Sequence, residues 1–277
     1  MPEIVADLHL HSTFSDGLNS PEELAQLVVD KGLKAFSITD HDSVKGIEQA
    51  KTDKATLIPG IELTSTLEGK EVHLLGYYIN TAYAPLLETL DNIAARREKR
   101  LLDIVDKLNT AGKVRLDKDE LAESLEKRSY NRLNLARFMV KKGLTPSVER
   151  AFNLYIGDNA TAYEAVNFFS PVAAIRLIHK AGGIAFLAHP YSNNTSALIP
   201  ELVECGLNGI EAFHPSHTLA SVEKCFDWAK RFKIGLSGGS DFHGNANSPR
   251  KILAAGLTGE RLVEFMALNP LRDFVAA

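Results

Sequence analysis

The chain has 277 residues, of which 45% are hydrophobic and 24% are charged, and its formal net charge is −4. This composition is ordinary for a globular protein, and the length suits one α/β barrel domain of about 250 residues, with or without an insertion. Proteins that hold long duplex nucleic acid normally carry a strong basic excess, which is missing here, although local arginines could still bind small anions.

No apolar run approaches the ~20 residues that a membrane helix needs, and the N-terminal residues do not resemble a secretory signal. We therefore expect a cytoplasmic protein without membrane contact. Its two cysteines, Cys205 and Cys225, are expected to be reduced thiols.

Short β-branched runs alternate with helical segments over the first 84 residues. A helix is expected to begin at Ser20, which can cap it together with Glu23, and to end at Gly32. A second helix is expected after Asp42. The predicted strands cover residues 4–8, 35–39 and 56–61.

Residues 62–66 and 71–78 have strand character and flank the sequence Glu68-Gly69-Lys70. This pattern predicts a hairpin with a short turn that contains glycine. Folding the hairpin brings Glu62 and His73 to neighbouring positions on adjacent strands.

Strand signals are absent between residues 85 and 163, where helical periodicity takes over. A long helix is predicted from Leu86 to Leu108, with Gly112 as its end, and shorter helices over residues 119–126, 132–142 and 146–155. We interpret residues 85–163 as an all-helical insertion that covers the active site of a domain made of residues 1–84 and 164–277.

The alternation resumes in the last third of the chain. Helices are predicted at residues 171–181, 197–205, 219–232 and 260–266, and strands at 184–188, 209–213 and 234–237. About seven strands that mostly alternate with helices indicate an α/β fold closed as an irregular TIM-like barrel. A doubly wound open sheet is the alternative, but no glycine-rich phosphate loop follows the first strand.

Side chains that can bind metal ions recur at the ends of the predicted strands. In a parallel barrel these ends meet on one face, so we expect the side chains to converge. His9 and His11 are separated by one residue, so both project to the same side of an extended strand. The set comprises His9, His11, Asp16, His41, Glu62, His73, His189, Asp241 and His243.

Imidazole and carboxylate ligands suit zinc, iron or manganese, and a carboxylate can bridge two ions. Two or three ions could generate a hydroxide near neutral pH and stabilise the charge that builds on a phosphoryl group. A single histidine at a strand end is usually structural, which is our interpretation of His179 and His217. His214 could either support the metal ligands or lie at the edge of the substrate, and Asp40 and Asp42 are interpreted as supporting groups.

Six segments of the chain together resemble the successive motifs of the polymerase and histidinol phosphatase (PHP) superfamily of phosphoesterases. They are ADLHLHSTFSDG, SITDHD, GIEL, EVHLLG, LAHP and GSDFHG, in the expected order. The resemblance implies a (β/α)7 barrel with two or three divalent ions, with manganese expected and iron or zinc as alternatives.

The resemblance also implies ligand sets. It assigns one ion to His9, His11, Glu62 and Asp241, a second to Glu62, His73 and His189, and a third to Asp16, His41 and His243. Catalysis is assigned to Glu62, Asp241 and His243.

Within this superfamily, the helical insertion is similar to that of bacterial enzymes that remove the 3′-phosphate of nucleoside 3′,5′-bisphosphates. Two sequences carry this likeness, residues 96–100 and 131–137, and guanidinium groups suit phosphate because they offer paired donors. Relatives often carry a histidine where this chain has Asn134, and this difference bears on which substrate the protein binds. The residues implied in substrate binding are Arg96, Arg97, Lys99, Arg100, Arg132, Asn134 and His214.

We therefore predict hydrolysis of the 3′-phosphate of a small phosphorylated nucleotide. The close alternative is a 5′→3′ exonuclease on short oligonucleotides, and a histidinol phosphate phosphatase fits the insertion less well. A non-catalytic module that binds nucleotide is the alternative from another class. It would be expected to have lost metal ligands, and none is missing here. For Arg96, Arg100 and Arg137, a solvated helix face is an equally good interpretation.

Overall fold

The computed structural model describes residues 3–112, 114–125, 129–157, 160, 162, 168–244 and 250–270. It divides into two compact units, Met1–Leu87 with Phe168–Ala277, and Glu88–Asn167. The domain boundaries predicted from the sequence stay a prediction, and the one between Tyr163 and Glu164 lies outside the described residues. The predicted helix end at Glu126 also lies outside them.

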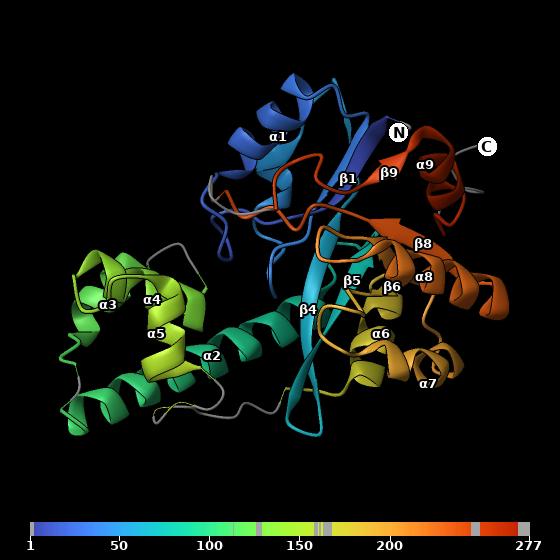
Figure 1. Ribbon diagram of the computed structural model, residues 1–277. Coiled ribbons are helices and arrows are strands. Elements are labelled where there is room, and N and C mark those ends of the chain that lie inside the picture. The colour runs from blue at the N-terminus through green and yellow to red at the C-terminus, as the bar shows by residue number, and fades with distance from the viewer. Residues whose placement is uncertain are drawn as a thin grey trace. The chain divides into compact units, whose positions relative to one another are not determined.

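The first unit contains two sheets with helices packed against them (Figure 1). Its strands are β1 (Ile4–Leu10), β2 (Ala35–Ile38), β3 (Thr56–Leu57), β4 (Gly60–Leu67), β5 (Lys70–Tyr77), β6 (Ile184–Leu187), β7 (Gly209–Phe213), β8 (Gly235–Gly238) and β9 (Leu257–Thr258). Its helices are α1 (Pro21–Asp30), α6 (Pro171–Lys180), α7 (Ile199–Glu204), α8 (Leu219–Phe232) and α9 (Gly259–Met266), with short 3₁₀ turns at Ile47–Ala50 and Ser196–Leu198.

One sheet has the strand order β3-β2-β1-β9 and the other β4-β5-β6-β7-β8. Pairing is parallel in β1–β2–β3 and in β6–β7–β8, and antiparallel for β9 on β1 and for β4–β5–β6. Two isolated parallel bridges join the sheets, Leu10 with Phe242 and His41 with Glu62. The fold is therefore of the mixed α/β class predicted from the sequence.

The helix α1 shows how the sequence determines where an element begins and which side chains it buries. The side chain of Ser20 accepts a hydrogen bond from the Glu23 amide, and the Glu23 side chain accepts one from the Ser20 amide, which together form a capping box. The helix buries Leu24 and Val28 in a cluster with Phe36 of β2. Burying aliphatic side chains of this size contributes about 1.5–3 kcal/mol each.

Two predicted elements differ from the structure, and one strand was not predicted. The helix expected after Asp42 is only the 3₁₀ turn Ile47–Ala50. The strand expected over residues 56–61 is divided into β3 and β4 on either side of Pro59, which has no amide hydrogen for a sheet. The two-residue strand β9 is too short to show periodicity and was not predicted.

The second unit contains helices and no strand among its described residues. It begins within the long helix α2 (Ala84–Thr110). It continues with α3 (Lys118–Ser124), α4 (Arg132–Lys141), α5 (Val148–Ala151) and a π turn at Phe152–Ile156. The helix predicted over residues 146–155 begins after Ser147, whose side chain caps α5. Leu101, Leu121, Leu135 and Ile156 belong to a separate core within this unit.

Of the helices described, none combines the length and the apolar character that crossing a membrane would require. Cys205 and Cys225 are both free thiols, in agreement with the prediction from the sequence.

Candidate metal centre

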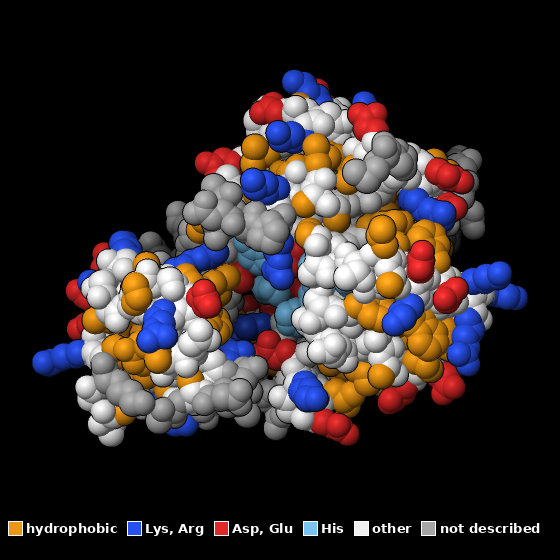
Figure 2. Space-filling model, in the orientation of Figure 1, with side chains coloured by type: hydrophobic (Ala, Val, Ile, Leu, Met, Phe, Trp, Pro, Cys, Tyr) orange, Lys and Arg blue, Asp and Glu red, His pale blue; other side chains and the backbone are white. Residues whose placement is uncertain are grey.

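All nine predicted metal ligands lie in the first unit, either on strands of the two sheets or in segments that follow those strands. His9 is on β1, which continues two residues beyond its predicted end, and His11 follows it. Glu62 is on β4 and His73 on β5. The others lie in segments that follow a strand: Asp16, His41, His189, Asp241 and His243. Histidine side chains are visible together on the face shown in Figure 2.

Glu62 lies at the middle of the group, and its side chain is 1% exposed. Its Oε2 atom lies 3.4 Å from Nε2 of both His9 and His11, and 2.9 Å from Nδ1 of His41. Its Oε1 atom lies 2.9 Å from Nδ1 of His73 and 3.0 Å from Nε2 of His189. One carboxylate therefore faces five imidazoles. Glu62 and His73 lie at neighbouring positions, as the hairpin predicted. His73 pairs directly with Thr64, however, and reaches Glu62 diagonally.

Asp241 forms a second point of convergence. Its Oδ1 atom lies 3.1 Å from Nε2 of His11, 3.6 Å from Nε2 of His9 and 3.5 Å from Nδ1 of His243. Its Oδ2 atom lies 3.2 Å from Nε2 of His214 and 2.6 Å from Nη1 of Arg250. The two oxygens thus have different neighbours.

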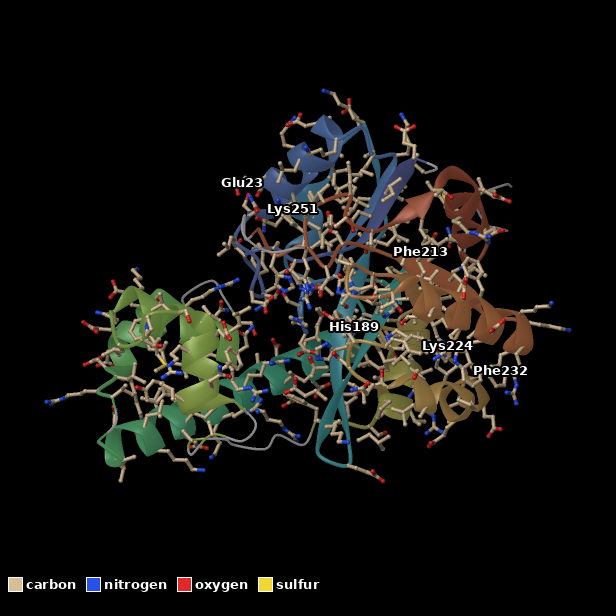
Figure 3. The ribbon with its side chains drawn as sticks, in the orientation of Figure 1. Glu23, His189, Phe213, Lys224, Phe232 and Lys251 are labelled. Atoms are coloured by element: carbon tan, nitrogen blue, oxygen red, sulfur yellow. The ribbon has the colours of Figure 1, made fainter. Side chains whose placement is uncertain are left out.

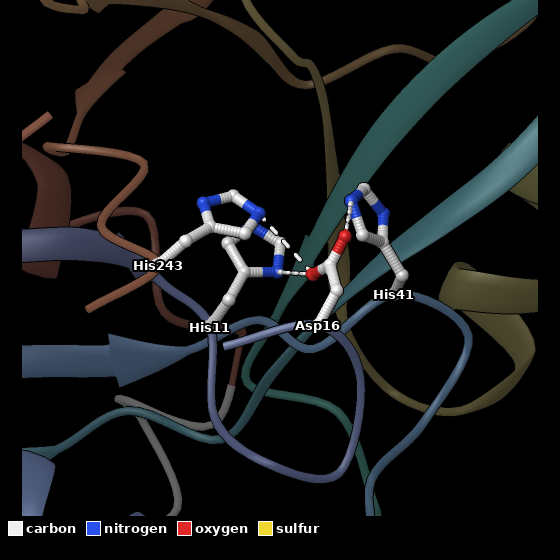
Figure 4. A group of neighbouring side chains, drawn as sticks. All are labelled: His11, Asp16, His41 and His243. Atoms are coloured by element: carbon white, nitrogen blue, oxygen red, sulfur yellow. Dashed lines mark ion pairs between the residues drawn. The ribbon is translucent and has the colours of Figure 1, made fainter. Parts of the chain in front are cut away.

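The third group surrounds Asp16 (Figure 4). Its Oδ1 atom lies 3.2 Å from Nε2 of His243 and 3.8 Å from Nδ1 of His11, and its Oδ2 atom lies 3.9 Å from Nε2 of His41. One ligand atom from each of these four residues lies within 4.8 Å of all the others. The same closeness holds for His9, His11 and Asp241, and for His41, Glu62 and His73.

The donor atoms fit metal ions better than they fit one another. Among the described residues, the buried atoms Nε2 of His9, Nε2 of His11 and Oε2 of Glu62 have no hydrogen-bond partner. A buried polar atom without a partner costs about 1–3 kcal/mol. Divalent cations between these imidazoles and carboxylates would satisfy all three atoms at once.

Without cations, protons must balance the charges in the centre. Burial opposes charge on His73 and His243, but Glu62 raises the pKa of His73 to about 10, and Asp16 raises the pKa of His243 to about 9. Despite burial, the imidazoles hold the pKa of Glu62 well below its usual range. Burial, and then the charge on His243, lowers the pKa of His11 to about 3.

Backbone strain marks two of the ligand positions. His189 has φ 30° and Asp241 has φ 50°, which lie in the left-handed region that glycine favours. Such conformations cost on the order of 1–3 kcal/mol and persist where the surroundings hold them, often at functional sites.

Sequence reasoning missed Glu211, which is fully buried on β7. Its Oε1 atom lies 2.9 Å from Nδ1 of His9, and its Oε2 atom accepts a hydrogen bond from the His189 amide at 2.8 Å. A carboxylate on the far side of a ligating histidine fixes the ring and its tautomer. The available signal was a glutamate inside an otherwise apolar strand.

Asp40, interpreted from the sequence as a supporting group, accepts hydrogen bonds from the Ser12 amide at 2.7 Å, from the Ser12 hydroxyl at 2.6 Å and from the Ser15 hydroxyl at 2.6 Å. It therefore fixes the loop that carries His11 and Asp16. Arg250, on the other hand, was not singled out, because it lies outside the quoted motifs.

His214 is brought beside Asp241, and its side chain is fully buried. Its Nδ1 atom lies 2.6 Å from the hydroxyl of Ser216. His179 bonds to Asn208, away from the ligands. His217 bonds to the carbonyl of Ala212, and its ring centroid lies 5.5 Å from that of His214.

The other predicted substrate residues belong to the second unit. Arg97 and Arg100 are buried on α2, and Lys99 forms a surface pair with Asp103, whose Oδ2 atom lies 2.7 Å from Nζ. Arg96 also lies on α2. Arg132 and Asn134 lie on α4 and form hydrogen bonds within the second unit. Arg132 donates to the carbonyl of Ile156 at 3.3 Å, and Asn134 donates to the carbonyl of Ser129 at 2.9 Å. Their role toward phosphate stays a prediction.

Comparison with known proteins places this geometry in a family. Residues 7–139 match the PHP domain. A 5′-3′ exoribonuclease from Haemophilus influenzae is 33% identical, with 86% of this chain and 89% of the relative covered. A phosphoribosyl 1,2-cyclic phosphate 1,2-diphosphodiesterase from Eggerthella lenta is 30% identical, with 87% and 95% covered. A 3′,5′-nucleoside bisphosphate phosphatase from Chromobacterium violaceum is 28% identical, with 89% and 90% covered.

The fold also has a solved counterpart. The crystal structure of a protein from Bifidobacterium adolescentis superposes with a TM-score of 0.86, at 24% identity, and covers 96% of this chain and 97% of its own. Two curated relatives are at least 30% identical to this chain, and the match covers most of their length. The chain belongs to the PHP family of metal-dependent phosphoesterases.

Proposed function

We propose that the protein hydrolyses the 3′-phosphate of nucleoside 3′,5′-bisphosphates or of a similar small phosphorylated nucleotide. The observation that carries this proposal is the position of Glu62, whose two oxygens face five imidazoles in a buried centre. The curated relative named as a 3′,5′-nucleoside bisphosphate phosphatase supports the choice of substrate.

Two or three divalent ions would occupy the centre, with manganese expected and iron or zinc as alternatives. Glu62 would bridge two of them, since its two oxygens serve different groups of histidines. The proposed ligands are His9, His11, Asp16, His41, Glu62, His73, His189, Asp241 and His243. When bound, the ions would activate water for attack on phosphorus and offset the charge of the phosphoryl group.

The chain itself supplies orientation and substrate binding. Glu211 holds the ring of His9 so that Nε2 faces the centre, and Asp40 holds the loop of His11 and Asp16. Arginines of the second unit are proposed to anchor the other phosphate of the substrate by paired hydrogen bonds, and this unit is proposed to cover the active site. The proposed substrate groups are Arg96, Arg97, Lys99, Arg100, Arg132, Asn134 and His214.

We also propose that the two sheets close into an irregular seven-stranded barrel. The isolated parallel bridges, one from Leu10 to Phe242 and one from His41 to Glu62, support this closure. Both bridges involve residues at or beside the ligands, so closure would bring the strand ends of the two sheets together around the ions. The cytoplasmic location of the protein stays a prediction.

The second candidate is a 5′→3′ exonuclease on short oligonucleotides. The curated relative named as a 5′-3′ exoribonuclease, which is 33% identical, favours it. Both activities would use the same centre, and they differ in whether the hydrolysed phosphate is terminal or links two nucleotides.

Release of inorganic phosphate from a nucleoside 3′,5′-bisphosphate, with added manganese, tests the leading proposal. We expect turnover by the unmodified protein and by His179→Ala, whose histidine lies outside the centre, and none by His9→Ala. A 3′-labelled oligonucleotide incubated in parallel tests the second candidate, since stepwise shortening of the labelled strand without release of free phosphate would favour the exonuclease. Turnover by His9→Ala equal to that of His179→Ala would exclude the centre as the catalytic site.

A further inference from the structure

Arg250 reaches the metal centre from the segment between β8 and β9. Its Nη1 atom lies 2.6 Å from Oδ2 of Asp241, the oxygen that also faces His214. The other oxygen of Asp241 faces His11 and His243. Asp241 therefore has one oxygen available for metal ions, and Arg250 contacts the other.

Exposure separates the two groups at this oxygen. The side chain of His214 is fully buried, that of Asp241 is 5% exposed, and that of Arg250 is 41% exposed. A molecule that approaches Asp241 from solvent would therefore meet Arg250 and not His214. The guanidinium carries five N–H donors in one plane, and several groups can therefore bind it together.

Charge explains what Arg250 would bind. Asp16, Glu62 and Asp241 supply three negative charges, and Glu211, which is buried against His9, supplies a fourth. Three divalent ions would bring six positive charges. An arginine beside such an excess of positive charge is disfavoured unless an anion lies there too. A phosphomonoester dianion offsets both the ions and the guanidinium, and its oxygens match the spacing of the guanidinium donors.

We propose that Arg250 binds the phosphoryl group that is hydrolysed, by donating hydrogen bonds to its non-bridging oxygens while Nη1 stays on Asp241. This proposal rests on the proposed function, in that the centre acts on phosphate. It gives the first unit a substrate-binding arginine of its own, in addition to those predicted in the second unit.

Binding of inorganic phosphate to the manganese-loaded protein, freed of excess metal and followed by calorimetry, tests the proposal without turnover. We expect Arg250→Ala to weaken phosphate binding at least tenfold, since a hydrogen bond to a charged group contributes about 1.5–3 kcal/mol. Arg250→Lys should keep part of the affinity. Lys251→Ala is the matched control, because Lys251 is exposed and lies away from His189 (Figure 3), and it should bind as the unmodified protein does.

Metal content, measured on the same samples, distinguishes binding of phosphate by Arg250 from a role in which Arg250 only positions Asp241. Arg250→Ala with full metal content and weaker phosphate binding supports the proposal. Unchanged phosphate affinity in Arg250→Ala and Arg250→Lys overturns it, and so does loss of manganese in both variants, which would make Arg250 a positioning residue for Asp241. If the unmodified protein binds phosphate through Arg250 but hydrolyses no bisphosphate nucleotide, the proposed substrate is wrong and the role of Arg250 stands.

Discussion

Oε1 of Glu211 lies 2.9 Å from Nδ1 of His9, while Nε2 of the same ring lies 3.4 Å from Glu62. The imidazole is thus held on one side by a fully buried carboxylate and presented on the other side to the centre. Burial opposes charge on Glu211, but the nearby imidazoles, His9 first, lower its pKa below the usual range. Glu211 therefore stays ionised and keeps a proton on Nδ1 of His9, which leaves Nε2 as the ligand atom.

Replacement of Glu211 should weaken metal binding without removing a ligand. We expect Glu211→Gln to lower manganese affinity by about 10–100-fold, which is the usual effect of changing the partner of a ligating histidine. Competition with a coloured chelator measures this affinity. Glu223→Gln, a change of the same type at an exposed position on α8, should leave it unaltered. Equal affinities in the two variants would contradict this role of Glu211.

The loop held by Asp40 should control one group of ligands more than the others. Asp40→Asn removes charge from a carboxylate that accepts three hydrogen bonds from Ser12 and Ser15, and we expect a loss of about 1–3 kcal/mol in the free energy of unfolding. His11 and Asp16 lie in this loop, so the ion bound by Asp16 should be lost first. Metal stoichiometry by mass spectrometry checks this, and loss of all ions at once would argue against a separate third site.

The metal-free protein should lose stability as pH rises. The folded-state pKa of His73 is about 10 and that of His243 about 9, both above the usual 6.5. Their protonated forms therefore stabilise the fold fully below pH 6.5, and this contribution is lost as pH rises through 9 to 10. Urea unfolding of chelator-treated protein at pH 6.5 and 9.5 measures the difference.

Added manganese should reduce this pH dependence, because ligands give up their protons when they bind metal. His73→Gln should also reduce it in the metal-free state, since it removes one of the two groups. A free energy of unfolding that does not change between the two pH values would show that these histidines are not protonated in the folded chain.

Gly239 is required by a close approach of two strands. A Cβ atom at this position would lie 2.3 Å from the amide nitrogen of His9, closer than real contacts allow. We expect Gly239→Ala to cost about 1–3 kcal/mol, as overpacking usually does, and to weaken metal binding by displacing His9. Gly259→Ala serves as the control, because its added Cβ would meet nothing within 4 Å. Thermal melting of both variants tests the difference.

Much of this centre could be predicted from the sequence because of local rules. His9 and His11 share a side through the two-residue period of a strand, and parallel strand ends converge wherever the strands lie in the sheets. The neighbouring positions of Glu62 and His73 could be predicted because the turn of their hairpin is recognisable in the sequence. These inferences needed only the neighbouring residues and the general geometry of α/β folds.

Other features depend on contacts between distant parts of the chain, which no local pattern contains. Glu211 lies 202 residues from His9, and Arg250 lies outside the quoted motifs. The helix expected after Asp42 was replaced by a turn because the segment is positioned by tertiary contacts, among them the hydrogen bond from the Asp42 amide to the Glu62 carbonyl. Tertiary context of this kind overrides intrinsic preference.

The bridge between His41 and Glu62 has a consequence for the order of folding. These residues pair their backbones where one sheet meets the other, and Leu10 pairs with Phe242 at the other junction. A chain that leaves the ribosome from its N-terminus has no second junction until Phe242 has emerged, so the ligand sets that include Asp241 and His243 stay incomplete until then. Ions would therefore be captured late, by a nearly finished fold, and would hold the second junction in place once it had formed.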